Sequence, residues 1–302
     1  MANAASDGAT AALLRPLCEG ANIRTWVGFK HFMYLGEQAV LDWFRDREAG
    51  PSALFHRYGL GLSVISSSAQ LPAVLDLDDV TDAAVTGGPE RFEVKLTAHR
   101  HGTPTVLRAR VGVALVKEAD APASAPPPWL APLVIADVGD AGATARPDRE
   151  APPGAGNGAT GYAWSWRVPY YFCQYSNRMQ HSGYVRVLEE AVDRFLADKG
   201  LGIADVLRDR GWIPVVSRAR VSLLADAVMG ETMHTTMSVT DVLKRTCFAA
   251  RMDCYVPRGR AMVHTASADI LHAYAIARGE SAGQTAELDD GFIAALTRGR
   301  PS

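Results

Sequence analysis

Residues 178–200, RMQHSGYVRVLEEAVDRFLADKG, decide the fold class. From Tyr184 onward, apolar side chains recur every three or four residues, through Val187 and on to Phe195, which is the spacing of one face of an α-helix. The apolar stripe is wide enough for a curved sheet to cover it. The stretch therefore predicts a long amphipathic helix that begins at His181 and extends to about Phe195.

A second copy of this pattern lies about 150 residues earlier. Residues 31–44 have the same helical period, and in both halves a glycine-punctuated loop leads from the helix into segments that alternate like β-strands. Each half closes with two strands around a turn, at 91–116 in the first half and at 244–274 in the second. The matching positions are His31 and His181, Tyr34 and Tyr184, Gly59 and Gly211, and Gly102 and Gly259.

A segment rich in Pro, Ala and Gly separates the two halves. Residues 119–163 show no sustained period, which is typical of a connection. We therefore expect an α+β protein made of two tandem units, each a long central helix wrapped by an antiparallel sheet. The expected boundaries are 1–118 for the first unit, 119–163 for the linker and 164–302 for the second unit.

The composition is that of an ordinary globular protein. The 302 residues are 48% hydrophobic, and the net charge of −2 argues against nucleic acid as a partner. The four cysteines form no CxxC pair and no zinc-type spacing with histidine, so we expect reduced thiols and no metal. The sequence contains no evident secretion signal and no apolar run of about 20 residues, so we expect a cytoplasmic protein without a membrane partner.

The second half resembles the hotdog-fold acyl thioesterases. Residues 181–196 and 217–255 are similar to the 4-hydroxybenzoyl-CoA and acyl-carrier-protein thioesterase branches, and residues 22–116 are similar to them more weakly. Two copies in one chain resemble the double hotdog of the plant-type acyl-carrier-protein thioesterases. The resemblance implies an acyl-thioester hydrolase that uses no metal or redox cofactor.

The family's catalytic motifs are kept only in part. Where one branch has an Asp and a His ahead of the helix, this chain has Gln174 and Arg178. The plant-type Asn-x-His-x-x-Asn pattern falls on Ser176, Arg178 and His181 and is also lost. A third branch uses His-Gly-Gly with an acid nine residues after the histidine, and His181 with Glu190 matches that spacing.

Thioester chemistry suggests roles for these residues. A helix N-terminus has unsatisfied N–H groups that can hold a carbonyl oxygen, and Ser182 is at that position. The carboxylate that attacks the carbonyl or activates water would be Glu190 or Glu37, because hotdog sites form between two units; His31 would then meet Glu190. The expected catalytic residues are His181, Glu190, Asn177, Arg178 and Glu37. The expected substrate-binding residues are Gln174, Gln180, Ser182, Gly183, Tyr184, His31 and Tyr34.

Structural roles for the same residues remain open. His181 could cap the helix, Glu190 could form local ion pairs on a solvated face, and the two tyrosines could be core residues. Arg178 suits a pantetheine phosphate or an enolate oxygen but could equally be a surface arginine.

Three functions remain open at this point. The first is hydrolysis of an acyl-CoA or acyl-carrier-protein thioester, in fatty-acid or polyketide-type biosynthesis. The second is a dehydratase or cyclase that acts on a carrier-bound chain, and the third is an acyl-binding protein without catalysis. In each case we expect a monomeric pseudo-dimer or a homodimer.

Overall fold

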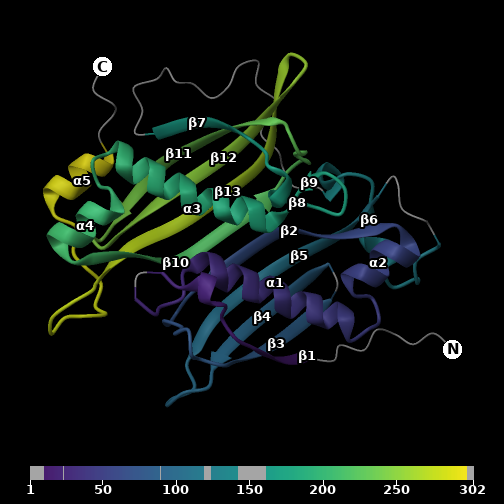
Figure 1. Ribbon diagram of the computed structural model, residues 1–302, viewed down its shortest axis with the longest axis horizontal. Coiled ribbons are helices and arrows are strands. Elements are labelled where there is room, and N and C mark those ends of the chain that lie inside the picture. The colour runs from purple at the N-terminus through teal and green to yellow at the C-terminus, as the bar shows by residue number, and fades with distance from the viewer. Residues whose placement is uncertain (1–9, 23, 89, 119–123, 142–160, 298–302) are drawn as a thin grey trace.

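One large, mostly antiparallel sheet carries two long helices, which confirms the predicted α+β class (Figure 1). The computed structural model describes residues 10–22, 24–88, 90–118, 124–141 and 161–297. The helices are α1 (Phe29–Arg45), α2 (Pro51–Tyr58), α3 (His181–Asp198), α4 (Ile203–Arg210) and α5 (Asp290–Thr297). The strands are β1 (Thr10–Leu14), β2 (Leu60–Gln70), β3 (Thr81–Gly88), β4 (Arg91–Ala98), β5 (Thr105–Lys117), β6 (Val134–Ile135), β7 (Gly161–Arg167), β8 (Cys173–Gln174), β9 (Arg178–Met179), β10 (Trp212–Leu223), β11 (Thr232–Leu243), β12 (Cys247–Arg258) and β13 (Ala261–Ile276).

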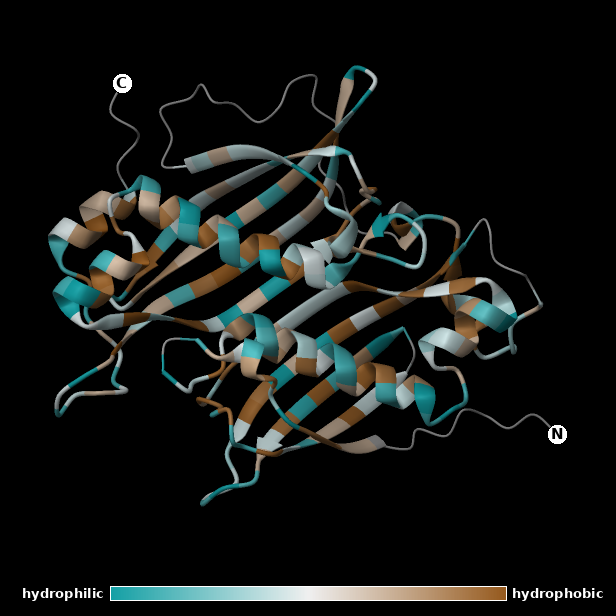
Figure 2. Ribbon diagram, in the orientation of Figure 1, coloured by the Kyte–Doolittle hydropathy of each residue, from teal (hydrophilic) through white to brown (hydrophobic). Residues whose placement is uncertain are grey.

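The two long helices form where the sequence predicts them. α1 includes the predicted 31–44 segment, and α3 begins at His181 as predicted. Tyr184, Val187 and Phe195 of the apolar stripe are fully buried, and burial of a side chain such as Val187 or Phe195 stabilises the fold by about 1.5–3 kcal/mol. Hydrophobic and hydrophilic segments alternate along both helices (Figure 2). Apolar burial thus determines which face of each helix meets the sheet.

The order of strands in the sheet is the same in the two halves. Neighbouring strands run β3-β4-β5-β2 in the first half and β11-β12-β13-β10 in the second, and β1 and β7 lie at the outer edges. β2 and β10 pair with each other, residues 66–70 against 218–222, so the sheet continues from one half into the other. α1 and α3 lie side by side across this junction (Figure 1).

Turns occur at the predicted glycines. Gly102 lies between β4 and β5 and Gly259 between β12 and β13, with φ angles of 80° and 64°. Gly59 and Gly211 end α2 and α4, both with φ 65°. These left-handed conformations are strained for most residues but not for glycine. Gly61, two residues after Gly59, lies within β2.

Two short helices were missed by the sequence analysis. α2 and α4 have eight residues each, about two turns, which is too short for the apolar period to be distinctive. They occupy the same place in each half, between the long helix and the strand at the junction.

The predicted linker is only partly described. Within residues 124–141, β6 pairs in parallel with β5, and Leu130 and Val138 are buried against the core. Residues 119–123 and 142–160 are outside the described residues, as are 1–9 and 298–302 at the ends of the predicted units. The boundary expected at 163/164 falls inside β7. The division into two domains stays a prediction.

All four cysteines are free thiols. In the described part of the chain, His, Cys, Asp and Glu side chains form no group of three or more that could hold a metal ion. None of the described helices is both long and apolar enough to span a membrane.

Candidate active site

A short hairpin holds the start of α3. β8 and β9 pair Cys173 with Met179, and Gln180 follows as the residue that precedes the helix. The backbone N–H of Gln180 donates to the carbonyl of Phe172 at 2.9 Å. A side chain at Gly183 would meet Phe172 and Met179 at 3.2 Å, so protein fills the space beside this glycine. Gly183 therefore allows the hairpin, rather than a ligand, to approach the helix.

His181 brings the two halves together at this point. Its side chain is 4% exposed, and Nε2 lies 2.8 Å from the hydroxyl oxygen of Ser67 on β2. The other ring nitrogen, Nδ1, lies 3.9 Å from Oε2 of Glu37 on α1. Neither Nδ1 nor Oε2 has a hydrogen-bond partner among the described residues. Two buried polar atoms thus face each other across the junction, too far apart to bond directly.

Burial shifts both pKa values toward the neutral forms. It lowers the pKa of His181 to about 4 and raises the pKa of Glu37 to about 7. At neutral pH the imidazole is therefore unprotonated, and the carboxyl is divided between its acid and carboxylate forms. The Glu37 side chain is one quarter exposed, so this side of the pair reaches solvent.

Tyr34 connects the two long helices beside this pair. Its hydroxyl accepts a hydrogen bond from Nε of Arg186 at 2.8 Å and lies 3.5 Å from the carbonyl oxygen of Ser182. Burial raises the pKa of Tyr34, so its hydroxyl remains protonated near neutral pH. Ser182 follows His181 in α3, and Tyr34 lies about one turn before Glu37 on α1; the Tyr34 hydroxyl and the Ser182 carbonyl both have contacts within the protein.

The Arg178 guanidinium is paired with buried carboxylates of the protein, so it is not available to bind a phosphate group. It forms a close ion pair with Glu118, and its Nε lies 3.9 Å from Asp226. Glu118 also accepts a hydrogen bond from Ser176 at 2.9 Å. Together with Tyr175, the Arg178–Glu118 pair fills the space over Gly61.

The other residues expected near this site have mainly structural contacts. The side-chain nitrogen of Gln174 donates to the carbonyl of Leu62 at 3.4 Å. Asn177 is exposed, and its carbonyl accepts a hydrogen bond from the N–H of Met229 at 2.7 Å. Tyr184 is fully buried in the core.

His31 does not meet Glu190. Its Nε2 accepts a hydrogen bond from the backbone N–H of Leu17 at 2.9 Å, and its Nδ1 lies 3.7 Å from Glu19. Burial lowers the pKa of His31 below its ordinary value. The two matching histidines thus have different surroundings, one against its own N-terminal segment and one against the other half.

A groove of about 630 Å³ lies at the start of α1 and beside residues 186–193 of α3, and neither His181 nor Glu37 is among its lining residues. It runs beside the first part of β10, residues 212–216, which pairs with β13 but not with β2. Apolar walls come from Trp26, Phe29, Phe32, Ile213, Val215 and Ile270. Arg186, Glu189, Glu190 and Asp193 of α3 contribute the polar rim.

Glu190 is therefore placed away from His181. Nine residues turn an α-helix by about two and a half turns, so the two side chains leave α3 on opposite sides. Glu190 is 46% exposed and forms an ion pair with Arg194 at 2.6 Å, one turn further along. The His-x-Gly spacing that singled out Glu190 thus does not bring the acid to the histidine; Glu37 has that place.

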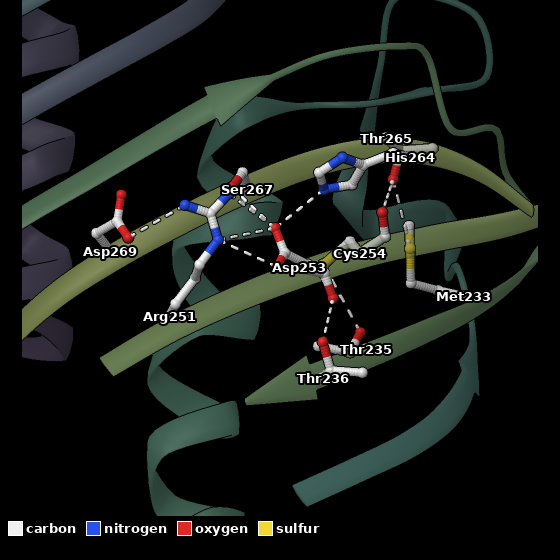
Figure 3. A network of polar contacts seen from close by, with 10 residues as sticks. All are labelled: Met233, Thr235, Thr236, Arg251, Asp253, Cys254, His264, Thr265, Ser267 and Asp269. Atoms are coloured by element: carbon white, nitrogen blue, oxygen red, sulfur yellow. Dashed lines mark hydrogen bonds and ion pairs between the residues drawn. The ribbon is translucent and has the colours of Figure 1, made fainter. Parts of the chain in front are cut away.

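A second titratable cluster lies on β12 and β13 (Figure 3). The Asp253 carboxylate accepts hydrogen bonds from His264 at 3.1 Å, from Ser267 at 2.9 Å and from both ends of the Arg251 guanidinium. Burial alone would raise the pKa of Asp253, but these donors outweigh it and hold the pKa well below its usual range. Asp253 is thus held as a carboxylate by its donors, and the cluster is a buried structural network.

Sequence reasoning missed Ser67 and Glu118. Ser67 is one of three consecutive serines, and a bulge in β2 between Val64 and Ser66 changes which of them faces inward. Glu118 ends the first half, just before the Pro-rich segment, and no pattern links it to Arg178. A charged residue at the end of a strongly apolar strand was the one available signal.

The C-terminal half matches a known family. Residues 168–296 match the family model of the thioesterase-like superfamily, whereas the comparison with curated proteins gives no match.

Three solved structures share the fold over most of the chain. A protein provisionally described as an oleoyl thioesterase, from Lactobacillus plantarum, has a TM-score of 0.61 and 11% identity over 89% of this chain and 97% of its own. The 12:0-ACP thioesterase from Umbellularia californica has a TM-score of 0.59 and 9% identity, over 88% and 94%. An acyl-ACP thioesterase from Bacteroides thetaiotaomicron has a TM-score of 0.54 and 8% identity, over 87% and 97%. At these identities, the likeness establishes a shared fold.

Proposed function

We propose that this chain, whose residues 168–296 match the family model of the thioesterase-like superfamily, hydrolyses an acyl thioester of coenzyme A or of an acyl carrier protein. The single observation that carries the proposal is the pair formed by His181 and Glu37, whose unpartnered polar atoms face each other across the two halves at 3.9 Å. The thioester substrates named for the structural neighbours support the choice of substrate class.

The proposal includes a double-hotdog architecture. The repeated strand order, one long helix in each half and the β2–β10 junction support two hotdog units in tandem. The site would then lie between units, with the helix start from the second unit and the acid from the first.

Glu37 is the proposed general base. One oxygen atom can lie about 2.8 Å from both Nδ1 of His181 and Oε2 of Glu37, since these two atoms are only 3.9 Å apart. A water in that position would give its proton to the Glu37 carboxylate while its oxygen attacks the thioester carbonyl. A carboxyl with a pKa of about 7 is well matched to this step near neutral pH.

The start of α3 would stabilise the developing negative charge. The first-turn amides of a helix have no intrahelical acceptors, and the amide of Ser182 is next to His181. The carbon–sulfur bond then breaks, the proton held by Glu37 passes to the leaving thiolate, and the products are a carboxylic acid and a free thiol. Ser67 positions the imidazole through Nε2.

One observation favours dehydration of a β-hydroxyacyl thioester as a second candidate. Near neutral pH, His181 is an unprotonated base and Glu37 is partly a neutral acid, and the two come from different halves. A base and an acid in this arrangement could remove a proton from the α-carbon and protonate the leaving hydroxyl.

A panel of thioesters distinguishes these functions. Saturated and 3-hydroxylated acyl-CoAs of increasing length, and the same chains on an acyl carrier protein, are incubated with the protein. Free thiol is measured with a thiol reagent and products by mass spectrometry. Thiol release that is lost in Glu37→Gln supports hydrolysis. A product that has lost one water and keeps its thioester would show dehydration instead of hydrolysis. If no substrate gives any product, both proposed functions are rejected.

A further inference from the structure

We propose that the groove at the start of α1 is a second binding site, separate from the His181–Glu37 pair, and that it takes an uncharged aliphatic chain carrying a hydroxyl group. The site is defined by Trp26, Phe29, Phe32, Ile213, Ile270 and His272, all of which line the groove. Its volume of about 630 Å³ is in the range of small-molecule sites.

The walls favour an aliphatic ligand. Phe29, Phe32, Ile213 and Ile270 form a packed apolar wall, and the lining residues Trp26 and Val215 are only partly buried, so apolar surface in the groove remains in contact with water. A flexible acyl or alkyl chain would cover the same apolar surface without requiring polar partners along its length.

His272 supplies the polar group inside the groove. Its side chain is 3% exposed and its Nδ1 is buried without a hydrogen-bond partner among the described residues. Its ring stacks on Phe248, with centroids 4.8 Å apart, and meets Tyr274 edge-on at 5.2 Å. These contacts hold the ring in place and leave Nδ1 without a hydrogen bond.

A hydroxyl group matches this histidine better than a carboxylate does. Burial lowers the pKa of His272 to about 3, so the ring is neutral and offers one N–H donor and one nitrogen acceptor. A hydroxyl can both donate and accept, whereas a carboxylate can only accept and would bring a charge into an apolar pocket.

The polar rim of the groove carries charges that are largely paired within the protein. Glu189, Glu190 and Asp193 line the groove together with one cation, Arg186. The Arg186 guanidinium is already bonded to the Tyr34 hydroxyl. Glu189 is paired with Lys30 at 3.3 Å and Glu190 with Arg194 at 2.6 Å, so the preference for an uncharged ligand rests on His272 and the apolar walls.

The test measures ligand binding and not turnover. Its outcome therefore does not depend on whether Glu37 catalyses hydrolysis. Isothermal titration calorimetry compares methyl octanoate with methyl octanoates that carry one hydroxyl at positions 3 to 8, and mass spectrometry checks that the esters stay intact. We expect at least one hydroxylated isomer to bind about tenfold more tightly than methyl octanoate. Its free acid should bind more weakly than its ester.

Two variants test whether the preference for the hydroxylated ester comes from His272. His272→Phe keeps an aromatic ring against Phe248 but removes both nitrogens, so the hydroxylated and plain esters should bind equally. Ile270→Ala removes apolar wall and should weaken both ligands while preserving their ratio. Thermal unfolding of each variant checks that it is folded.

Three results would each overturn the proposal. These are a preference below threefold for every isomer with the wild-type protein, a preference that persists in His272→Phe, and affinities that Ile270→Ala leaves unchanged. The comparison of hydroxylated and plain esters uses the wild-type protein alone, so it tests the proposal even if His272→Phe does not fold.

Discussion

Replacing Glu37 by Gln should abolish activity and at the same time stabilise the protein. The carboxyl has an ordinary pKa of 4.5 and a folded-state pKa of about 7, because burial penalises its charged form. A raised carboxyl pKa means that the folded state binds more protons than the unfolded state between these values, so stability falls as pH rises through this window. The neutral amide does not have this cost.

The size of the effect follows from the shift. A displacement from 4.5 to about 7 corresponds to roughly 3 kcal/mol of stability lost by the wild type above pH 7. His181 acts in the opposite direction, because its lowered pKa of about 4 makes stability rise with pH up to about 6.5. The two terms largely cancel in the wild type between pH 4.5 and 6.5, whereas Glu37→Gln leaves the histidine term alone.

Two measurements check this reasoning. Urea unfolding at pH 4.5, 5.5, 6.5 and 7.5 should show a Glu37→Gln advantage that grows with pH toward about 3 kcal/mol. Thioester hydrolysis should rise in the wild type with an apparent pKa of about 7 and fall by about 10²- to 10⁴-fold in the variant. Asp42→Asn, which removes an ion pair with Arg45 on the same helix, is the matched control and should change little. Activity within fivefold of the wild type would refute the role of Glu37, and a pH-independent stability difference would refute its buried environment.

Three further predictions concern stability and are measured by urea unfolding. Arg178→Met leaves the Glu118 carboxylate buried without its cation and should cost about 3–5 kcal/mol; a loss below 1 kcal/mol would mean that water reaches this carboxylate. Asp253→Asn should cost roughly 3 kcal/mol at pH 7, and the cost should shrink below about pH 4, since a depressed carboxyl pKa stabilises the fold only above its unfolded value; a loss equal at pH 3 and pH 7 would contradict the ionised network. Gly61→Ala would place a methyl group 2.8 Å from Tyr175 and still closer to Glu118, so it should cost about 1–3 kcal/mol, whereas Gly88→Ala, which meets nothing within 4 Å, should be nearly neutral.

The helices and the repeat were predictable because they depend on local patterns. The apolar period of α3 predicts a helix whatever the surface that buries its apolar face. The helix is predicted to begin at His181 because the period is absent before that residue. The glycines at 102 and 259 marked turns for the same local reason. Such features need no knowledge of what the chain packs against.

The partners of the site residues were less predictable because they come from distant segments. Glu37 is one of two acids that the sequence offered, and only the antiparallel packing of α1 against α3 places it, rather than Glu190, beside His181. Arg178 looked available because Glu118 is 60 residues away in the sequence. Ser67 depended on a bulge, and a single inserted residue reverses the face of every residue that follows.

The repeated backbone arrangement surrounds an open groove near the start of α1 and a filled space near the start of α3. A bridge between Trp26 and Asp76 at one end corresponds to a bridge between Arg178 and Val228 at the other. At the first end the neighbouring groove is open, and at the second Tyr175, Arg178 and Glu118 fill the matching space over Gly61.

The packing at the start of α3 affects the pKa of Glu37. Protein packed around the Glu37 carboxyl removes most of its contact with water, and this burial raises its pKa to about 7. An open cavity at the same end would hydrate the carboxylate and return its pKa toward 4.5, where it would be a weaker base. The groove lies beside the start of α1, where the matching histidine, His31, is held against Leu17. Under the two proposals, proton transfer takes place at the start of α3 and an aliphatic chain binds at the start of α1.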